Sequence, residues 1–397
     1  MLEYAGSQRA GRSGEREAPH LLAVVRSFDW ILVISLGALL VVGLWGIGGV
    51  TSHDVSGNPN YFLDRQLLYA GVGALALIGA ALIDPDLYRR YWRAIYGVIV
   101  GLIVVVFFAG HAVNGSTRWL NVGFFQFQPS EFGKLLVVLA LAGLIAERQR
   151  VVGEWGTTLR ILLFGAAPVL LVFIQPDLGT ALVYMAALTA MLFVAGTPWV
   201  HLFILGFTAL LLVATVLWIG PALGVQFLKG YQQARLTCFV DASRCSDAQG
   251  YNQQQSKITV GAGGIGGVGP NASSQVNGGF LPAHSTDFAF ASYAEQRGFV
   301  GAVILLALYL LVLWRGLRVV TVARDLFSAV VAGGIVLALF FQIFINVGMT
   351  MGIAPITGIP LPFVSVGGSS MIANLAAMGV LLAIHARGRG ARSSRRR

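Results

Sequence analysis

Charged residues are scarce in this sequence. Asp, Glu, Lys and Arg together make up 11% of its 397 residues, whereas a soluble domain carries roughly 25%. So few charges cannot cover a water-exposed surface of this size, and 56% of the residues are hydrophobic. The composition therefore excludes an ordinary soluble protein and predicts that a lipid bilayer is the main solvent of the chain.

Cysteine is almost absent as well. The sequence has only Cys238 and Cys245, and two cysteines seven residues apart match no metal-binding pattern. A disulfide between them and two free thiols are equally compatible with the sequence. A cleavage site of small residues is also lacking after the first apolar run, so we expect this run to stay in place as a membrane helix.

About ten apolar stretches are long enough to span a membrane, which takes about 20 residues of α-helix. They are 30–50, 65–83, 94–110, 129–146, 158–175, 178–197, 201–221, 299–314, 328–350 and 370–386. A long segment, 222–298, separates the seventh stretch from the eighth. The pattern predicts an all-α polytopic membrane protein with a basic N-terminal tail (1–27), a membrane domain (28–386) and an Arg-rich C-terminal tail (387–397).

Arginine is concentrated in alternate connections between these stretches. The basic set is Arg9, Arg12, Arg16, Arg26, Arg89, Arg90, Arg93, Arg148, Arg150, Arg315, Arg318, Arg324, Arg387, Arg389, Arg392, Arg395, Arg396 and Arg397. Short basic loops stay in the cytoplasm, so both termini are expected there, with segments 51–64, 111–128, 222–298 and 351–369 outside. The net charge of +10 then reflects topology rather than nucleic-acid binding, and the C-terminal cluster is an anchor on anionic lipid or a partner site.

Most of the irregular, Gly- and Pro-rich sequence belongs to the predicted outer segments. Such backbone is tolerated at membrane depth only inside protein or along a wet cavity. Four stretches of this kind on one side therefore predict a cavity that opens outward. The glycines between 261 and 269 follow no strand and so predict no dinucleotide site. They form either a flexible loop or a close approach of the backbone to substrate.

Four charged residues lie at or near the outer ends of predicted spans. Glu131 and Lys134 are three residues apart on one helix face, and they form a structural ion pair or leave Lys134 to meet an anionic head group. Arg118 is a candidate phosphate ligand or an interfacial anchor. Asp177 begins the sixth span, where helix stabilisation is favoured over a substrate role.

Asp287 is the candidate general base. It precedes an apolar stretch that starts at Phe288, and partial desolvation there would raise its pKa and make it a better base. In the alternative interpretation Thr286 caps a helix and Asp287 occupies its first turn. The two roles are compatible.

The outer motifs resemble those of the SEDS family (shape, elongation, division and sporulation) from about Asp29 to Ala386. The motifs are Arg118-Trp119, Phe127-Gln128-Pro129-Ser130-Glu131 with Lys134, Gln175-Pro176-Asp177-Leu178-Gly179-Thr180-Ala181, Gln255-Ser256-Lys257, Leu281-Pro282 with Thr286-Asp287-Phe288, Gly358-Ile359-Pro360-Leu361-Pro362-Phe363, Ser365 and Gly367-Gly368-Ser369-Ser370. The stretch Asn346-Val347-Gly348-Met349-Thr350, followed by Thr357-Gly358-Ile359-Pro360-Leu361-Pro362, is more similar to the RodA branch than to FtsW. The chain departs from the family at Val366, often Tyr, and at Gln296, often acidic.

The resemblance implies a peptidoglycan glycosyltransferase that polymerises lipid II, a disaccharide-pentapeptide on undecaprenyl pyrophosphate, into glycan strands for cell elongation. Asp287 is then the catalytic base, and the implied substrate-binding residues are Arg118, Lys134, Lys257, Gln255, Ser256 and Ser365. The residues expected to support them are Glu131, Asp177 and Glu295. A divalent cation, Mg or Mn, is a candidate cofactor.

The resemblance also implies a partner, a single-pass class B penicillin-binding protein that cross-links the peptides. Three other functions fit the sequence less well. They are septal peptidoglycan synthesis in cell division, lipid II flipping and a non-catalytic scaffold. A transporter should show two similar halves with broken helices at the midplane, and no such internal repeat is visible in the sequence.

Overall fold

The computed structural model describes residues 25–113, 116–122, 125–215, 219 and 247–395, and most of them are helical. The helices are α2 (Trp30–Val50), α3 (Tyr61–Leu82), α4 (Pro85–Arg90), α5 (Trp92–Ala109), α6 (Pro129–Glu147), α7 (Trp155–Ile174), α8 (Leu178–Val194), α9 (Trp199–Ala214), α12 (Asp247–Ala262), α13 (Ser274–Asn277), α14 (Ala289–Val322), α15 (Leu326–Met351) and α16 (Gly368–Arg395). Short 3₁₀ turns lie at Gln149–Val151 and Pro270–Ala272.

The predicted membrane spans all appear as apolar helices. Within the described residues, seven helices are long and apolar enough to cross a membrane: α2, α3, α6, α7, α14, α15 and the Gly368–Gly390 part of α16. Three shorter apolar helices at 92–108, 178–194 and 199–214 account for the other predicted spans. The all-α membrane class is therefore confirmed.

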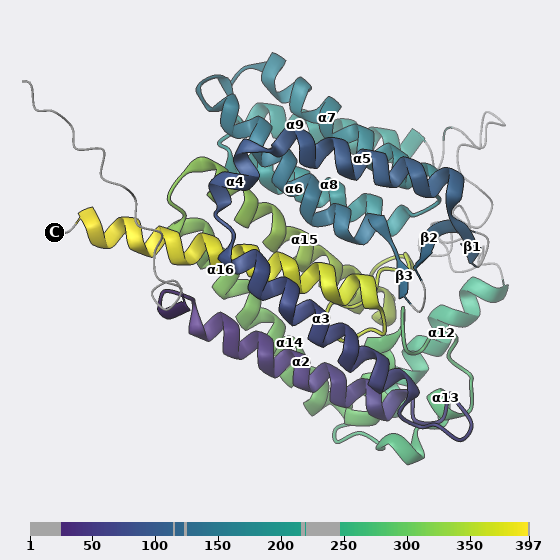
Figure 1. Cartoon of the computed structure of the whole chain (residues 1–397). Coiled ribbons are helices and arrows are strands. Elements are labelled where there is room, and N and C mark those ends of the chain that lie inside the picture. The colour runs from purple at the N-terminus through teal and green to yellow at the C-terminus, as the bar shows by residue number, and fades with distance from the viewer. Residues whose placement is uncertain (1–24, 114–115, 123–124, 216–218, 220–246, 396–397) are drawn as a thin grey trace, which may run out of the picture.

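The centre of the bundle is formed by α6, α15 and α16 (Figure 1). In the most apolar 18-residue stretch of each helix, 83%, 72% and 89% of the residues are buried. α16 lies along α3, and α15 packs against α6, α8 and α14. Small residues allow the close approach of α3 and α16. A Cβ on Gly379 would lie 2.2 Å from the carbonyl oxygen of Leu77, and one on Gly73 would lie 2.5 Å from the Leu375 side chain.

Ion pairs gather at one end of the bundle, here called the arginine end and defined by Asp29, Asp84, Asp86, Arg93, Glu147, Arg315, Arg324 and Arg387. Buried Asp29 caps α2, and Arg315 of α14 donates to its two carboxylate oxygens at 2.5–3.1 Å. Arg324 pairs with Asp86 at 2.8 Å, and Arg93 with Glu147 at 3.0 Å. These contacts join α2, α4, α5, α6 and α14 at this end of the bundle.

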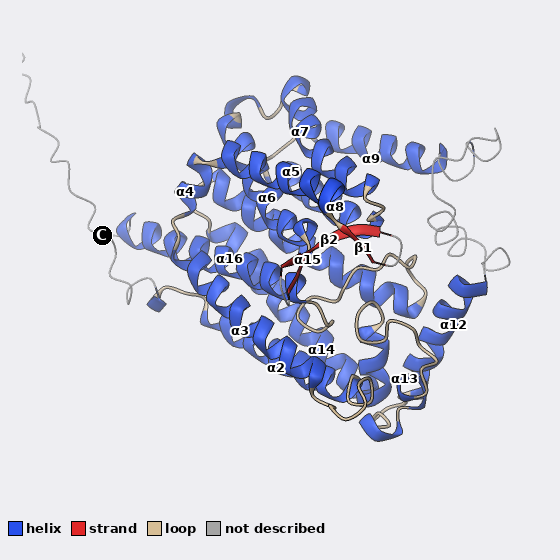
Figure 2. Ribbon diagram, turned by 45° about the vertical axis from the view of Figure 1, so that its right-hand side comes forward, coloured by secondary structure: helices blue, strands red, loops and turns tan. Residues whose placement is uncertain are grey.

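The opposite end, here called the loop end, contains the segments 51–60, 263–288 and 352–367 together with a small sheet (Figure 2). The sheet is antiparallel in the order β1 (His111–Val113), β2 (Ser116–Val122) and β3 (Phe125–Phe127). The sequence analysis expected an irregular loop here, because strands of three to seven residues carry too little alternation to be recognised. Pairing between the strands satisfies the hydrogen bonds of their backbone N–H and C=O groups, which lipid could not do.

The glycine run of 261–269 packs against a break in α14 at Gly298, where φ is 66°. The amide of Val268 donates to the carbonyl of Glu295 at 3.0 Å, so the run satisfies backbone groups near the break. A Cβ on Gly263 would lie 2.0 Å from the carbonyl oxygen of Ala294. Gly263 and Gly267 thus allow the run to pack backbone-to-backbone against α14. An added Cβ at Gly261, Gly264, Gly266 or Gly269 would meet nothing within 4 Å.

Candidate active site

Asp287 lies at the loop end, in a turn formed by residues 281–288 directly before α14. The helix begins at Ala289 with Phe288 at its N-cap, so the alternative interpretation, in which Thr286 caps the helix, is wrong. Ala283 has φ 51°, a left-handed conformation that reverses the chain. The amide nitrogens of Thr286 and Phe288 both donate to its carbonyl at 3.1 Å. The Asp287 side chain stays partly exposed beside buried Phe288.

Four consecutive carbonyl groups of this turn accept hydrogen bonds from three different parts of the fold. The pairs are Ser292 Oγ to His284 (2.8 Å), Val366 N to Ser285 (2.9 Å), Ser365 Oγ to Thr286 (2.6 Å) and Asn346 Nδ2 to Asp287 (2.8 Å). The donors come from α14, from the segment 352–367 and from α15. The backbone under Asp287 is therefore held from several directions.

Ser365 holds the turn with its hydroxyl group, which also accepts a hydrogen bond from the amide of Leu361 at 2.8 Å. It is itself fixed by Gln66 of α3, which is fully buried. The Gln66 side chain donates to the Ser365 carbonyl at 3.1 Å and accepts from the Gly367 amide at 3.2 Å. Since Ser365 is only 4% exposed, its contacts in this structure are with protein.

Asn346 and Gln66 are site residues that the sequence analysis missed. Asn346 is fully buried in α15, and its Nδ2 donates both to the Asp287 carbonyl at 2.8 Å and to the Ile359 carbonyl at 2.7 Å. It thereby ties the turn 281–288, here called the catalytic turn after the expected role of Asp287, to the segment 352–367. The sequence could have indicated both, because each is an uncharged polar residue within an apolar span. Polar groups are costly there and usually form specific contacts.

Arg118, in β2, contacts the connection between α7 and α8. Its Nε donates to the Gln175 carbonyl at 3.1 Å, its Nη2 donates to the Pro176 carbonyl, and its Nη1 lies 3.6 Å from Asp177 Oδ1. Asp177 caps α8 by accepting from the Thr180 amide at 3.1 Å, as expected for a carboxylate at a helix start. The guanidinium therefore locks the sheet onto this connection.

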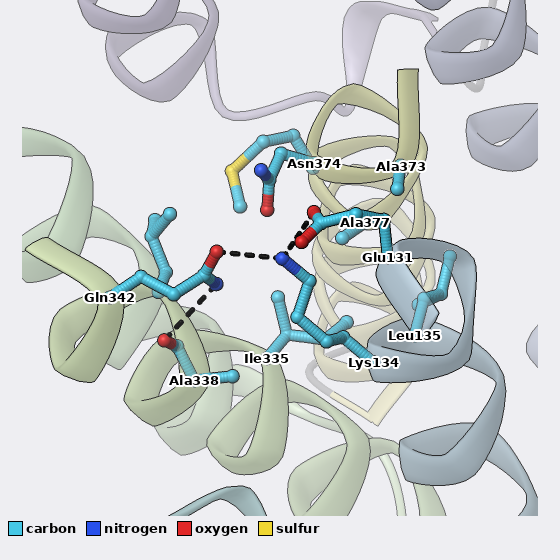
Figure 3. Close-up of a pocket in the computed structure, with 11 residues that line it drawn as sticks. Glu131, Lys134, Leu135, Ile335, Ala338, Gln342, Ala373, Asn374 and Ala377 are labelled. Atoms are coloured by element: carbon cyan, nitrogen blue, oxygen red, sulfur yellow. Dashed lines mark hydrogen bonds and ion pairs between the residues drawn. The ribbon is translucent and has the colours of Figure 1, made fainter. Parts of the chain in front are cut away.

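Lys134 forms the predicted ion pair with Glu131 (Figure 3). The Lys134 Nζ lies 2.5 Å from Glu131 Oε2 and 2.8 Å from Gln342 Oε1 of α15. The two charged side chains are only 7% and 3% exposed. They line a pocket between α6, α15 and α16, into which Asn374 also points. In this structure the partners of the Lys134 ammonium are therefore Glu131 and Gln342.

Lys257 is an exposed residue of α12 near the loop end of α15. Its side chain lies over Gly352, which caps α15 with φ 78°, and a Cβ there would come within 2.1 Å of the Lys257 Cε. Neighbouring Ser256 is buried and donates to the Thr350 carbonyl at 2.9 Å. Gln255 donates to the Gln275 side chain. These two neighbours hold α12 in place, while the ammonium group lies close to the end of α15.

Glu295 is fully buried and supports the segment before the catalytic turn. Its carboxylate oxygens accept from the amides of Gln275 at 2.9 Å and Val276 at 3.2 Å. This fits the predicted supporting role. Cys238 and Cys245 lie outside the described residues.

Nearly the whole chain matches one protein family. The family model for the cell cycle proteins FtsW, RodA and SpoVE matches residues 26–390. The chain belongs to the FtsW/RodA/SpoVE family. These are the SEDS proteins, so the predicted resemblance is confirmed.

Individual SEDS relatives align over most of the chain. Peptidoglycan glycosyltransferase MrdB of Escherichia coli K12 is 35% identical over 357 residues, 90% of this chain and 93% of that protein. Stage V sporulation protein E of Bacillus subtilis is 34% identical over 373 residues, covering 93% and 97%. A probable peptidoglycan glycosyltransferase FtsW of Thioalkalivibrio sulfidiphilus is 36% identical over 387 residues, covering 93% of each.

Solved SEDS structures share the fold. A chain from a peptidoglycan synthase complex, described as coordinating polymerization and crosslinking, has a TM-score of 0.77 and 32% identity, covering 91% of this chain and 98% of that chain. The rod shape determining protein RodA of Thermus thermophilus has a TM-score of 0.66 and 29% identity, covering 90% and 96%. The family match over residues 26–390 and these structures both cover the whole membrane domain, so the architecture is shared throughout it.

The structure gathers the predicted SEDS site residues into separate groups. Asp287 lies with Ser365, Arg118 with Asp177, and Lys134 with Glu131. A second pocket lies between the end of α2 and the catalytic turn, lined by Gly46, Ile47, Val50, Thr51, Ser285, Ala289, Tyr293 and Val364. Asp287 lines neither of the two pockets. The acid and the cations thus do not share one of these pockets, contrary to expectation.

A divalent cation would need a set of oxygen ligands. Across residues 25–395, apart from the undescribed stretches, no three His, Cys, Asp or Glu side chains come together as a metal site.

Proposed function

We propose that this SEDS protein polymerises lipid II into glycan strands at the outer face of the cytoplasmic membrane, for cell elongation and rod shape. The enzyme class is the confirmed part of this proposal, because full-length relatives bear the name peptidoglycan glycosyltransferase. The proposed reaction is supported by one observation: Asp287 is partly exposed, on a turn whose backbone is fixed by four hydrogen bonds.

The orientation follows from the charge of the two ends. The arginine end carries the short basic connections, which remain in the cytoplasm. The loop end, with Asp287, then faces outward, where a lipid-linked donor and a growing strand meet. Undecaprenyl chains would lie against the apolar side chains that α5, α9 and α14 expose.

Asp287 acts as the general base. Its carboxylate accepts the proton of an acceptor sugar hydroxyl, whose oxygen forms a bond to the anomeric carbon of the donor. The bond from that carbon to the pyrophosphate oxygen breaks, and undecaprenyl pyrophosphate leaves with the electron pair. The carboxylate must lie within about 3 Å of the attacking oxygen, and the fixed backbone of the turn provides that placement.

Lys257 is the cation assigned to the departing pyrophosphate. Arg118 is held by carbonyl groups and Asp177, and Lys134 is held by Glu131, whereas the Lys257 side chain is exposed. It also lies near the catalytic turn. Asn346 of α15 contacts the turn, and Gly352, six residues later at the end of the same helix, lies against Lys257. A positive group next to the departing pyrophosphate stabilises the charge that develops on it.

Substitution of Asp287 by Asn tests the base in purified protein supplied with lipid II. We expect glycan polymerisation to fall by about 10²-fold or more, because general bases contribute 10² to 10⁴. Asp64→Asn, at an exposed acid in the first turn of α3, is the matched control and should polymerise normally. Wild-type polymer from Asp287→Asn rejects the assignment, and polymer from the wild-type protein rules out a pure flippase or scaffold.

The elongation role rests on the segment Asn346-Val347-Gly348-Met349-Thr350, which is similar to the RodA branch. Overall identity does not separate the branches, since relatives named MrdB and FtsW are 35% and 36% identical. Complementation separates them. The gene should restore rod shape to cells depleted of their elongation polymerase and should not restore division to cells depleted of the septal one.

A class B penicillin-binding protein is the proposed partner, because a solved relative belongs to a complex that coordinates polymerization with crosslinking. Co-purification from membranes with the cognate transpeptidase, which we expect in equal amounts, is the test. Recovery of the polymerase alone would contradict it.

A further inference from the structure

The catalytic turn is also joined to the first loop of the chain by a side-chain pair. His284 Nε2 lies 2.9 Å from Asp54 Oδ1 and 3.1 Å from Asp54 Oδ2. The two side chains are 20% and 18% exposed, and 230 residues separate them in the sequence. Both distances involve the same ring nitrogen, so this is one bifurcated contact that joins the turn to the loop after α2.

Asp54 is well placed to hold the turn because its own backbone is tied to the end of α2. Its amide donates to the Thr51 carbonyl at 3.2 Å, and Thr51 is buried. The Thr51 hydroxyl and amide both donate to the Ile47 carbonyl at 2.9 Å. Asp54 therefore presents its carboxylate from a short turn closed onto a membrane helix.

The side of the turn that faces α2 is where additional support is needed. The four carbonyl hydrogen bonds come from α14, α15 and the segment 352–367. Towards α2 the turn borders the second pocket, which both Thr51 and Ser285 line. Ala283, next to His284, holds a left-handed conformation. Such a conformation persists only where the surroundings determine it strongly.

We propose that Asp54 and His284 are positioning residues for Asp287, so that the loop between α2 and α3 sets the geometry of glycosyl transfer. The inference rests on the proposed function, because it takes Asp287 as the base. The pair spans the side of the turn next to the second pocket and completes the support that the carbonyl hydrogen bonds provide. Loss of either side chain lets the turn shift towards that pocket, and Asp287 then leaves its productive position.

Breaking the pair should lower kcat for polymerisation and leave the KM for lipid II unchanged. Neither residue is among those assigned to the pyrophosphate, and only the placement of the base changes. We expect Asp54→Ala and His284→Ala each to lower kcat by about ten-fold or more, since a displacement of about 1 Å can cost 10²-fold. His53→Ala is the matched control, because His53 contacts Ser52 instead, and it should keep the wild-type kcat.

The reciprocal double variant Asp54→His with His284→Asp decides whether pairing is the cause. It restores the contact with the partners exchanged, so its kcat should exceed that of either single variant. Thermal unfolding of each purified protein checks that the fold is intact. If an alanine variant fails to fold, Asp54→Leu and His284→Phe replace it, because they fill similar space and remove the polar contact between the two side chains.

Three results would overturn the proposal: single variants with wild-type kcat, a reciprocal variant no faster than the singles, or a loss that lies in KM. Failure of the proposed base looks different, because Asp287→Asn would then polymerise normally. If instead only the positioning role is wrong, Asp287→Asn is inactive while Asp54→Ala and His284→Ala are fully active.

Discussion

The buried pair of Glu131 and Lys134 allows a sharp test of whether these charges serve the fold or the substrate. The side chains are 3% and 7% exposed, and their charged atoms lie 2.5 Å apart. Removal of one partner leaves the other charge buried and uncompensated, which costs about 3–5 kcal/mol. Replacement of both by apolar side chains of similar volume is often neutral or stabilising. The two single variants should therefore be much less stable than the double variant.

The test is a double-mutant cycle with Glu131→Met, Lys134→Met and the combined variant, measured as thermal unfolding of purified protein in detergent. Arg93→Met is the control at a more exposed pair, where the side chains are 71% and 40% exposed. There the loss should stay within about 1 kcal/mol. Single variants of Glu131 and Lys134 that unfold at the wild-type temperature would refute the reasoning. Full polymerisation by a stable double variant would further show that Lys134 is not needed for substrate.

Two further predictions follow from buried contacts. Asn346→Ala removes the donor to the carbonyls of Asp287 and Ile359, so stability should fall by about 1–3 kcal/mol for each buried carbonyl left unsatisfied, and polymerisation of lipid II should fall with it. Unchanged melting and polymer yield would contradict the role of Asn346. Gly263→Ala places a Cβ 2.0 Å from a carbonyl oxygen of α14, so the yield of monodisperse protein in size-exclusion chromatography should collapse. Gly261→Ala, where nothing lies within 4 Å of the added Cβ, should behave as wild type, and equal yields would show that the packing tolerates the change.

The membrane helices were predictable from the sequence because the bilayer imposes their length and composition. A span needs about 20 apolar residues whatever its neighbours are. The predicted stretch 129–146, for example, is observed as Pro129–Glu147, and 30–50 as Trp30–Val50. The separation of arginines from irregular loops was also visible, because topology depends on charge near helix ends. Asp287 stood out for a similar local reason, as an acid beside an apolar stretch.

The support around Asp287 was decided by tertiary structure, because its partners lie far apart in the sequence. Gln66 and the Ser365 carbonyl are 299 residues apart, and Asp54 and His284 are 230 apart. A single sequence holds no record of such pairings, since each residue is locally an ordinary polar side chain. The same holds for the cations. Their residue types suggested one phosphate-binding cavity. In the structure Arg118 instead contacts carbonyls of the connection between α7 and α8, and Lys134 contacts Glu131, since buried charges and polar groups must first find partners within the protein.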